Sequence, residues 1–217
     1  MVHPAHLHEP RLILDHLVFA VPDLEVSIEA FSAALGAAPA HGGRHESVGT
    51  HNAILPLRGG SYVELIAPDP SNPDPPLELP FGLAEATGPS LVTWAVGTRD
   101  IQAAVKSAQQ AGYDPGVVVD LARDLPDGKR LSWKLSLRRD LPADGLVPFL
   151  IDWGSAPHPS RTSDPVCSVE GFRAEHPNPE GVLPMLRALG VALDVERGPR
   201  ACLRATVVGP GGSLELG

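Results

Sequence analysis

The sequence predicts an α+β fold in which a strand–helix–strand–strand–strand (βαβββ) unit is used three times. The chain contains 24 prolines and 22 glycines among 217 residues, which without a short repeat indicates short elements joined by many turns. The same order of alternating strand patterns and one amphipathic helical pattern recurs along the chain. The glycines that end the three predicted helices fall in register when the units are aligned. They are Gly36, Gly112 and Gly190.

The first unit illustrates the pattern. Apolar and polar residues alternate over residues 12–21, which is typical of a strand. Asp23 follows and is expected to cap a helix with one apolar face, which Gly36 ends in the left-handed conformation. Two further strands joined by the Gly59–Gly60 turn complete the unit.

The other two units follow the same plan. Asp100 takes the capping position in the second unit, while Asn178 and Pro179 mark the start of the third helix. The predicted boundaries are 12–67 for the first unit, 68–89 for a Pro-rich linker, 90–154 for the second unit and 166–217 for a third, shorter unit.

Composition excludes several classes of protein. With 17 Lys and Arg against 26 Asp and Glu, the net charge of −9 argues against nucleic-acid binding, which depends on neutralising phosphates. No apolar run approaches the ~18 residues of a membrane span, and the N-terminus lacks the apolar core of a secretory signal. Cys167 and Cys202 form no disulfide framework. We therefore expect a cytoplasmic protein with no membrane or nucleic-acid partner.

Several segments carry a family resemblance. They are LDHLVFAVPDL (14–24), GGRHESVGTHNAILPL (42–57), YVELIAP (62–68), DG…LSW (127–133) and PFLIDW (148–153). Together they resemble the vicinal oxygen chelate superfamily, which includes glyoxalase I, extradiol dioxygenases and bleomycin-resistance proteins, and above all its glyoxalase-like domain family. The resemblance implies that two units pair into a cup, with a divalent metal ion inside that is held by the first and last strands.

The metal ligands that the resemblance implies are His16, Glu64 and Asp152. A carboxylate within an apolar strand is costly to bury unless it is paired or metal-bound, and Glu64 could also leave the metal and act as a catalytic base. Thr93 departs from the family pattern, because it stands where the second unit should carry a histidine. The alternatives are a three-ligand site with open positions or a cup that has lost its metal. His16 could instead be a core histidine, and Glu64 could face solvent.

A second set of polar residues is expected to contact a small-molecule ligand. His45, His51 and Asn52 fall at the predicted mouth of the cup, where turn chemistry is the alternative explanation. Arg130 beside Trp133 could receive a carboxylate-bearing or planar ligand. An exposed hairpin with the arginine packed over the indole is the alternative.

Two functions therefore stay open, and the sequence does not decide whether the protein is an enzyme. One is a metal-dependent lyase, isomerase or dioxygenase acting on a small oxygenated organic substrate. The other is a metal-free protein that binds or sequesters a small molecule, with His45, Asn52 and Arg130 as polar anchors. Because three units are an odd number for a fold whose sheets pair, the third could pack against a second chain in a homodimer.

Overall fold

The first unit forms one half of a closed barrel. The computed structural model describes residues 13–84, 88–125, 128–138 and 140–217. The elements of this unit are β1 (Ile13–Ala20), α1 (Leu24–Leu35), β2 (Ala40–His45), β3 (Thr50–Pro56) and β4 (Tyr62–Pro68). Strand β4 pairs in parallel with β1 and antiparallel with β3, which pairs antiparallel with β2.

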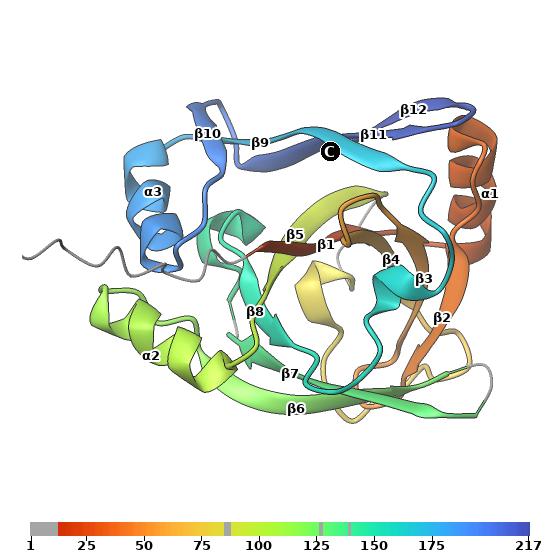
Figure 1. The fold of residues 1–217 in the computed structure, drawn as a ribbon, viewed down its shortest axis with the longest axis horizontal. Coiled ribbons are helices and arrows are strands. Elements are labelled where there is room, and N and C mark those ends of the chain that lie inside the picture. The colour runs from red at the N-terminus through yellow and green to blue at the C-terminus, as the bar shows by residue number, and fades with distance from the viewer. Residues whose placement is uncertain (1–12, 85–87, 126–127, 139) are drawn as a thin grey trace, which may run out of the picture.

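The second unit supplies the other half. Its elements are β5 (Ser90–Gly97), α2 (Ile101–Gln110), β6 (Val117–Asp124), β7 (Arg130–Leu137) and β8 (Phe149–Asp152). Antiparallel pairing of β1 with β5 and of β2 with β6 closes the barrel in the order β1-β4-β3-β2-β6-β7-β8-β5 (Figure 1). The structure confirms the α+β fold, and the predicted cup is this barrel.

The third unit forms a separate, smaller sheet on the outside of the barrel. Its elements are β9 (Ser168–His176), α3 (Pro179–Ala188), β10 (Asp194–Arg197), β11 (Cys202–Gly209) and β12 (Gly212–Leu216). The sheet runs above the barrel in Figure 1, with α1 at its right end and α3 at its left end. The rings of Phe172 on β9 and Trp94 on β5 pack edge to face, with centroids 5.1 Å apart. Because the third unit packs on its own barrel, its packing gives no reason to expect a partner chain, and the homodimer stays a prediction.

The predicted helix boundaries have local physical causes. Asp23 and Asp100 each accept a hydrogen bond of 3.0 Å from the third residue after them, as expected of N-caps. Helix α3 begins at Pro179, but the side chain of Asn178 does not cap it. Gly36 ends α1 with φ +66°, and a Cβ there would lie 2.9 Å from the backbone nitrogen of Gly211. Glycine therefore ends the helix and lets the β11–β12 turn approach it.

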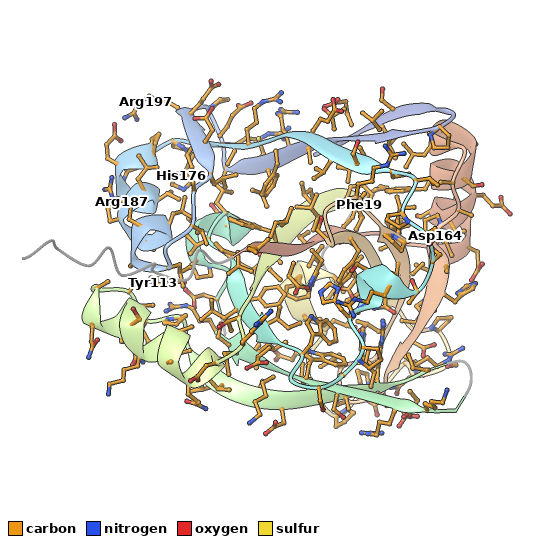
Figure 2. The ribbon with its side chains drawn as sticks, in the orientation of Figure 1. Phe19, Tyr113, Asp164, His176, Arg187 and Arg197 are labelled. Atoms are coloured by element: carbon orange, nitrogen blue, oxygen red, sulfur yellow. The ribbon has the colours of Figure 1, made fainter. Side chains whose placement is uncertain are left out.

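Strand alternation separates two cores. Along β1, Leu17 and Phe19 face the core between the barrel, the helices and the small sheet, whereas His16 and Val18 face the barrel interior. Figure 2 shows Phe19 inside the molecule and charged side chains such as Arg187 at its edge. The polar side chains that point into the barrel therefore determine the chemistry of its interior.

The predicted linker covers part of the barrel. Leu77, Pro80 and Phe81 line the interior cavity, and Leu83 is buried against the inward face of β1 and β4. Phe81 has φ +59°, a left-handed conformation that is costly for a non-glycine residue. Residues 85–87 of this linker, and Leu12 of the first unit, lie outside the described residues.

No helix in the described ranges is long and apolar enough to cross a membrane. The thiol of Cys167 is buried, that of Cys202 is partly exposed, and the two are not joined. The cytoplasmic location stays a prediction.

We expect the barrel and the small sheet to unfold together, because they share one core. Leu203 on β11 is buried in that core, so L203A should lower the free energy of unfolding by about 2–5 kcal/mol. The tryptophans (Trp94, Trp133, Trp153) all belong to the second unit, so their fluorescence during urea unfolding reports on the barrel. The exposed Val117 provides the control V117A. A tryptophan transition that L203A leaves unshifted would show that the small sheet folds independently.

Candidate functional site

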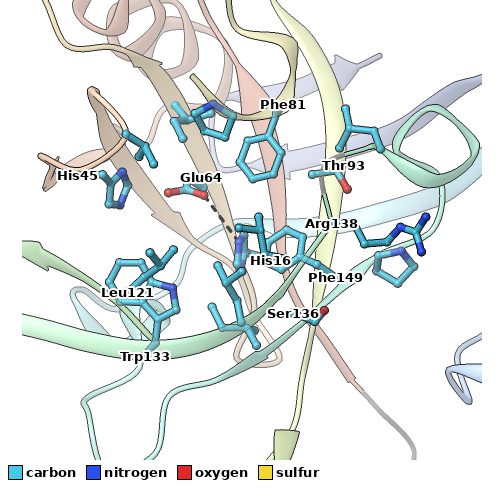
Figure 3. A pocket seen from close by; sticks show the side chains of 18 of the residues that line it. His16, His45, Glu64, Phe81, Thr93, Leu121, Trp133, Ser136, Arg138 and Phe149 are labelled. Atoms are coloured by element: carbon cyan, nitrogen blue, oxygen red, sulfur yellow. Dashed lines mark ion pairs between the residues drawn. The ribbon is translucent and has the colours of Figure 1, made fainter. Parts of the chain in front are cut away.

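The barrel encloses a cavity of about 170 Å³. Aromatic and aliphatic side chains form most of its lining, and Phe81, Trp133 and Phe149 contribute rings from three separate segments (Figure 3). The polar side chains that matter for the chemistry are His16, His45, Asn52, Tyr62, Glu64 and Arg123. An apolar cavity with a few polar groups is the usual form of a small-molecule site.

His16 is held in one orientation by its neighbour Asp15. Burial opposes ionisation of Asp15, but hydrogen bonds from His158 and His16 prevail and lower the pKa of this carboxyl to about 2. The ionised carboxylate accepts from His16 Nδ1 at 2.8 Å, from His158 Nε2 at 3.0 Å and from Trp153 Nε1 at 3.1 Å. Since Nδ1 of His16 carries the proton toward Asp15, its Nε2 faces Glu64.

Glu64 projects into the cavity from β4. It shares the inward phase of that strand with Tyr62 and Ile66. Its Oε1 accepts a hydrogen bond of 2.5 Å from Asn52 Nδ2, while its Oε2 lies 3.7 Å from His16 Nε2, beyond hydrogen-bond distance (Figure 3). One oxygen is thus held in place, and the other faces the histidine.

Asn52 links Glu64 to a buried arginine. Its Oδ1 accepts from Arg123 Nη1 at 2.7 Å, across from β3 to β6. Arg123 is only 4% exposed, and its Nε is buried with no hydrogen-bond partner among the described residues. A Cβ at position 42 would lie 2.5 Å from Nη1 and 2.3 Å from Asn52 Oδ1, so Gly42 makes room for this contact.

Asp15, His16, Glu64, Asn52 and Arg123 therefore form a row of polar side chains, here called the polar chain, across one wall of the barrel. Its members come from β1, β4, β3 and β6 and are hydrogen-bonded in sequence except between His16 and Glu64. It contains two carboxylates, Asp15 and Glu64, and ends at the guanidinium of Arg123. Buried charges are tolerated when they are paired and hydrogen-bonded. The polar chain meets most of that requirement, but the buried Nε of Arg123 has no hydrogen-bond partner among the described residues.

Two further cavity residues are neutral near pH 7. Burial lowers the pKa of His45 to about 4, and its Nδ1 lies 2.9 Å from Thr50 Oγ1. Burial also raises the pKa of Tyr62 well above its usual value, and its ring stacks on that of His16 with centroids 4.6 Å apart. Both residues can form hydrogen bonds to a ligand but add no charge.

Asp152 lies away from the residues that it was expected to join. Its side chain accepts hydrogen bonds from the backbone nitrogens of Ile101, at 3.3 Å, and Gly154, at 2.9 Å. The adjacent residues Ile151 and Trp153 line the cavity, so alternation turns Asp152 toward the start of α2. Its carboxylate supports the helix and the following turn and does not meet His16 or Glu64.

Some of the predicted substrate-binding residues also lie in the cavity, and others lie outside it. His45, Asn52 and Trp133 line the cavity, whereas His51 and Arg130 do not. Arg130 is an odd number of residues from Trp133, so it lies on the outer face of β7, where its exposed guanidinium contacts Asp124 at 3.2 Å. Alternation within the predicted strand that begins at residue 130 could have excluded Arg130, whereas His51 lay just before the strand that was predicted to begin at Asn52.

Arg123 was missed by the sequence analysis, although the sequence contains a signal for it. It shares the phase of Val119 and Leu121 on β6, and both of these lie on the apolar, inward face. An arginine in the apolar phase of a strand is unusual unless the interior contains a partner for it.

The described residues do not supply a suitable donor set for a divalent metal ion. His16 and Glu64 contribute two donors, the third position is Thr93, and Asp152 is directed elsewhere. In ranges 13–84, 88–125, 128–138 and 140–217, no group of three His, Cys, Asp or Glu side chains is arranged to hold a metal. Arg123 also places a positive charge on the wall that a cation would approach. The predicted three-ligand set is therefore not assembled.

The buried, neutral His45 should make stability depend on pH. Between pH 6.5 and 4 the unfolded chain binds a proton that the folded protein excludes, so stability falls as pH falls through this window. We expect H45Q to remove up to about 3 kcal/mol of this loss, measured by urea unfolding at several pH values. H41Q, at an exposed position, is the control and should leave the profile unchanged. An identical profile for H45Q and the unmodified protein would contradict the assignment.

One solved structure shares this fold, and others are less similar to it. A hypothetical protein from Staphylococcus aureus superposes with a TM-score of 0.67 at 15% identity, covering 94% of this chain and 98% of that chain, which shows the fold alone. Methylmalonyl-CoA epimerase from Mycobacterium tuberculosis has a TM-score of 0.45 at 24% identity, covering 69% and 95%. A hypothetical protein from Bacillus halodurans has a TM-score of 0.44 at 18% identity, covering 67% and 96%. No curated protein sequence matches the chain significantly.

The family assignment comes from the sequence itself. The glyoxalase-like domain family matches residues 14–190, a span that takes in the barrel and the start of the third unit. This match confirms the resemblance drawn from the repeated units. The chain belongs to the glyoxalase-like domain family.

Proposed function

We propose that the protein is an enzyme that moves a proton at a carbon atom next to a carbonyl group of a small organic molecule, without a metal ion. The observation that carries this proposal is the position of Glu64. One of its oxygens is held by Asn52, and the other faces His16 Nε2 inside an apolar cavity. A carboxylate placed in this way is suited to general base catalysis.

In the proposed step Glu64 Oε2 takes the proton from carbon. The electron pair of the broken C–H bond moves to the carbonyl oxygen and gives an enolate. The positive guanidinium of Arg123 lies on the same wall and favours this negative charge in a cavity of low dielectric constant. Return of the proton to carbon completes an isomerisation, whereas loss of a group from the neighbouring carbon makes the enzyme a lyase.

His16 acts beside Glu64 as the second proton carrier. Its Nε2 receives the proton from Glu64 Oε2 and returns it to the substrate, which allows the two groups to act at different positions. Asp15 keeps His16 in the orientation that this transfer requires, because its ionised carboxylate holds Nδ1. Asp15 is therefore a positioning residue, itself held by His158 and Trp153.

A second candidate is the metal-free binding function. The many aromatic rings in the cavity favour it, because a sequestering protein needs affinity and no reactive group. Tight binding of a small molecule without any proton transfer would support this alternative.

The test is deuterium exchange from solvent. Small 2-oxo acids and 2-hydroxyketones are incubated in D₂O with protein treated with EDTA, and loss of the proton signal at the carbon next to the carbonyl is followed by NMR. We expect E64Q to slow the exchange about 10²- to 10⁴-fold, because the amide cannot accept the proton. E25Q removes an exposed carboxylate and is the control.

Two results would contradict the proposal. One is exchange that E64Q leaves unchanged, since another group would then be the base. The other is exchange that EDTA abolishes and added Zn²⁺, Ni²⁺ or Mn²⁺ restores, since a metal would then be required. Absence of exchange with every compound, together with tight binding, would favour the sequestering function.

A further inference from the structure

Arg123 has more hydrogen-bonding capacity than the protein uses. A guanidinium offers five N–H donors in a fixed plane. Nη1 donates to Asn52, while Nε is buried with no partner among the described residues. A buried donor without an acceptor costs free energy. Nε itself is shielded, so the terminal N–H groups of this cavity-lining guanidinium are the ones that an acceptor on a bound molecule would meet.

The surroundings of Arg123 hold it in the wall of the cavity. Gly42 leaves the space that Nη1 occupies, and Asn52 fixes that end of the guanidinium. Glu64 is the nearest negative group of the polar chain, but it reaches Arg123 through Asn52. The guanidinium is therefore positioned by the protein and not neutralised by direct contact with Glu64.

The shape of the rest of the cavity limits the size of the molecule. Leu121 precedes Arg123 on the inward face of β6, and Trp133 lies on the neighbouring strand β7. The ring of Trp133 in turn packs on that of Trp153, with centroids 5.3 Å apart. The cavity of about 170 Å³ is similar to an apolar cavity of about 150 Å³ that is known to bind benzene.

We infer that the cavity takes a small monocarboxylate with an apolar or aromatic body, its carboxylate on Arg123 and its body against Leu121 and Trp133. A carboxylate matches the planar guanidinium better than other anions, because two parallel hydrogen bonds can form. The inference rests on the proposed function, because it names the substrate class of the same cavity. Arg123 and Glu64 line the same cavity, so a carboxylate held by Arg123 would bring the rest of the molecule into the space that Glu64 faces.

The experiment compares benzoate with its neutral analogue benzamide by isothermal titration calorimetry. We expect benzoate to bind at least about tenfold more tightly than benzamide. R123Q should weaken benzoate binding about 10- to 100-fold and leave benzamide unchanged, with R123K in between because it keeps the charge but loses the planar group. E64Q should strengthen benzoate binding, because it removes a like charge.

R130Q is the matched control. Arg130 lies on the neighbouring strand but on the outer face, where it pairs with Asp124, so its replacement should not change benzoate binding. Arg138 also lines the cavity, so if R123Q fails to fold, R123K and R138Q decide the question: weaker benzoate binding in R123K with unchanged binding in R138Q supports the inference, and the opposite result overturns it.

Equal binding of benzoate and benzamide, no binding of benzoate, or unchanged binding in a folded R123Q would overturn the inference. The outcome is separate from that of the proposed reaction. Absence of deuterium exchange together with selective benzoate binding would contradict the reaction and leave this inference standing. Deuterium exchange that depends on Glu64, together with equal binding of benzoate and benzamide, would support the reaction and overturn this inference.

Discussion

The hydrogen bonds of Asn52 to Glu64 and Arg123 are the interaction on which the barrel interior depends. A carboxylate and a guanidinium each cost several kcal/mol to bury unless another group compensates the charge. Here one amide side chain accepts from the cation and donates to the anion, so each charge is hydrogen-bonded and compensated. The same arrangement gives Glu64 a fixed oxygen and gives Arg123 a fixed end.

The fold supports this arrangement from both sides. Closure of the barrel brings β3 beside β4 and joins β2 to β6, which places Asn52 between Glu64 and Arg123. At the other end of the polar chain, His158 lies in the segment between the second and third units and holds Asp15. The third unit then covers the outer face of β5 through Phe172. All three repeated units therefore help to hold the site residues in place.

The repeated pattern was sufficient to predict the fold. Helix caps such as Asp23 and Gly36 act locally, so their spacing is visible in the sequence, and alternation identified the strands. His16 and Glu64 could be predicted to face the interior, because each is a polar residue among the apolar residues on one face of its strand. The position of Asp152 was predicted wrongly, because it was taken from the family resemblance and not from the alternation of side chains along its strand. Arg123 was missed, although the same alternation places it on the apolar face of its strand. The link through Asn52 could not be predicted, because it depends on the pairing of strands from two different units.

A double-mutant cycle between Glu64 and Arg123 measures how far the two buried charges depend on each other. We expect E64Q and R123Q each to lower the free energy of unfolding by about 3 kcal/mol, since each leaves one buried charge uncompensated. The double variant should lose less than the sum of the two losses, by at least about 1 kcal/mol. If the two losses add to within about 0.5 kcal/mol, the charges do not compensate one another, and the polar chain does not hold them together.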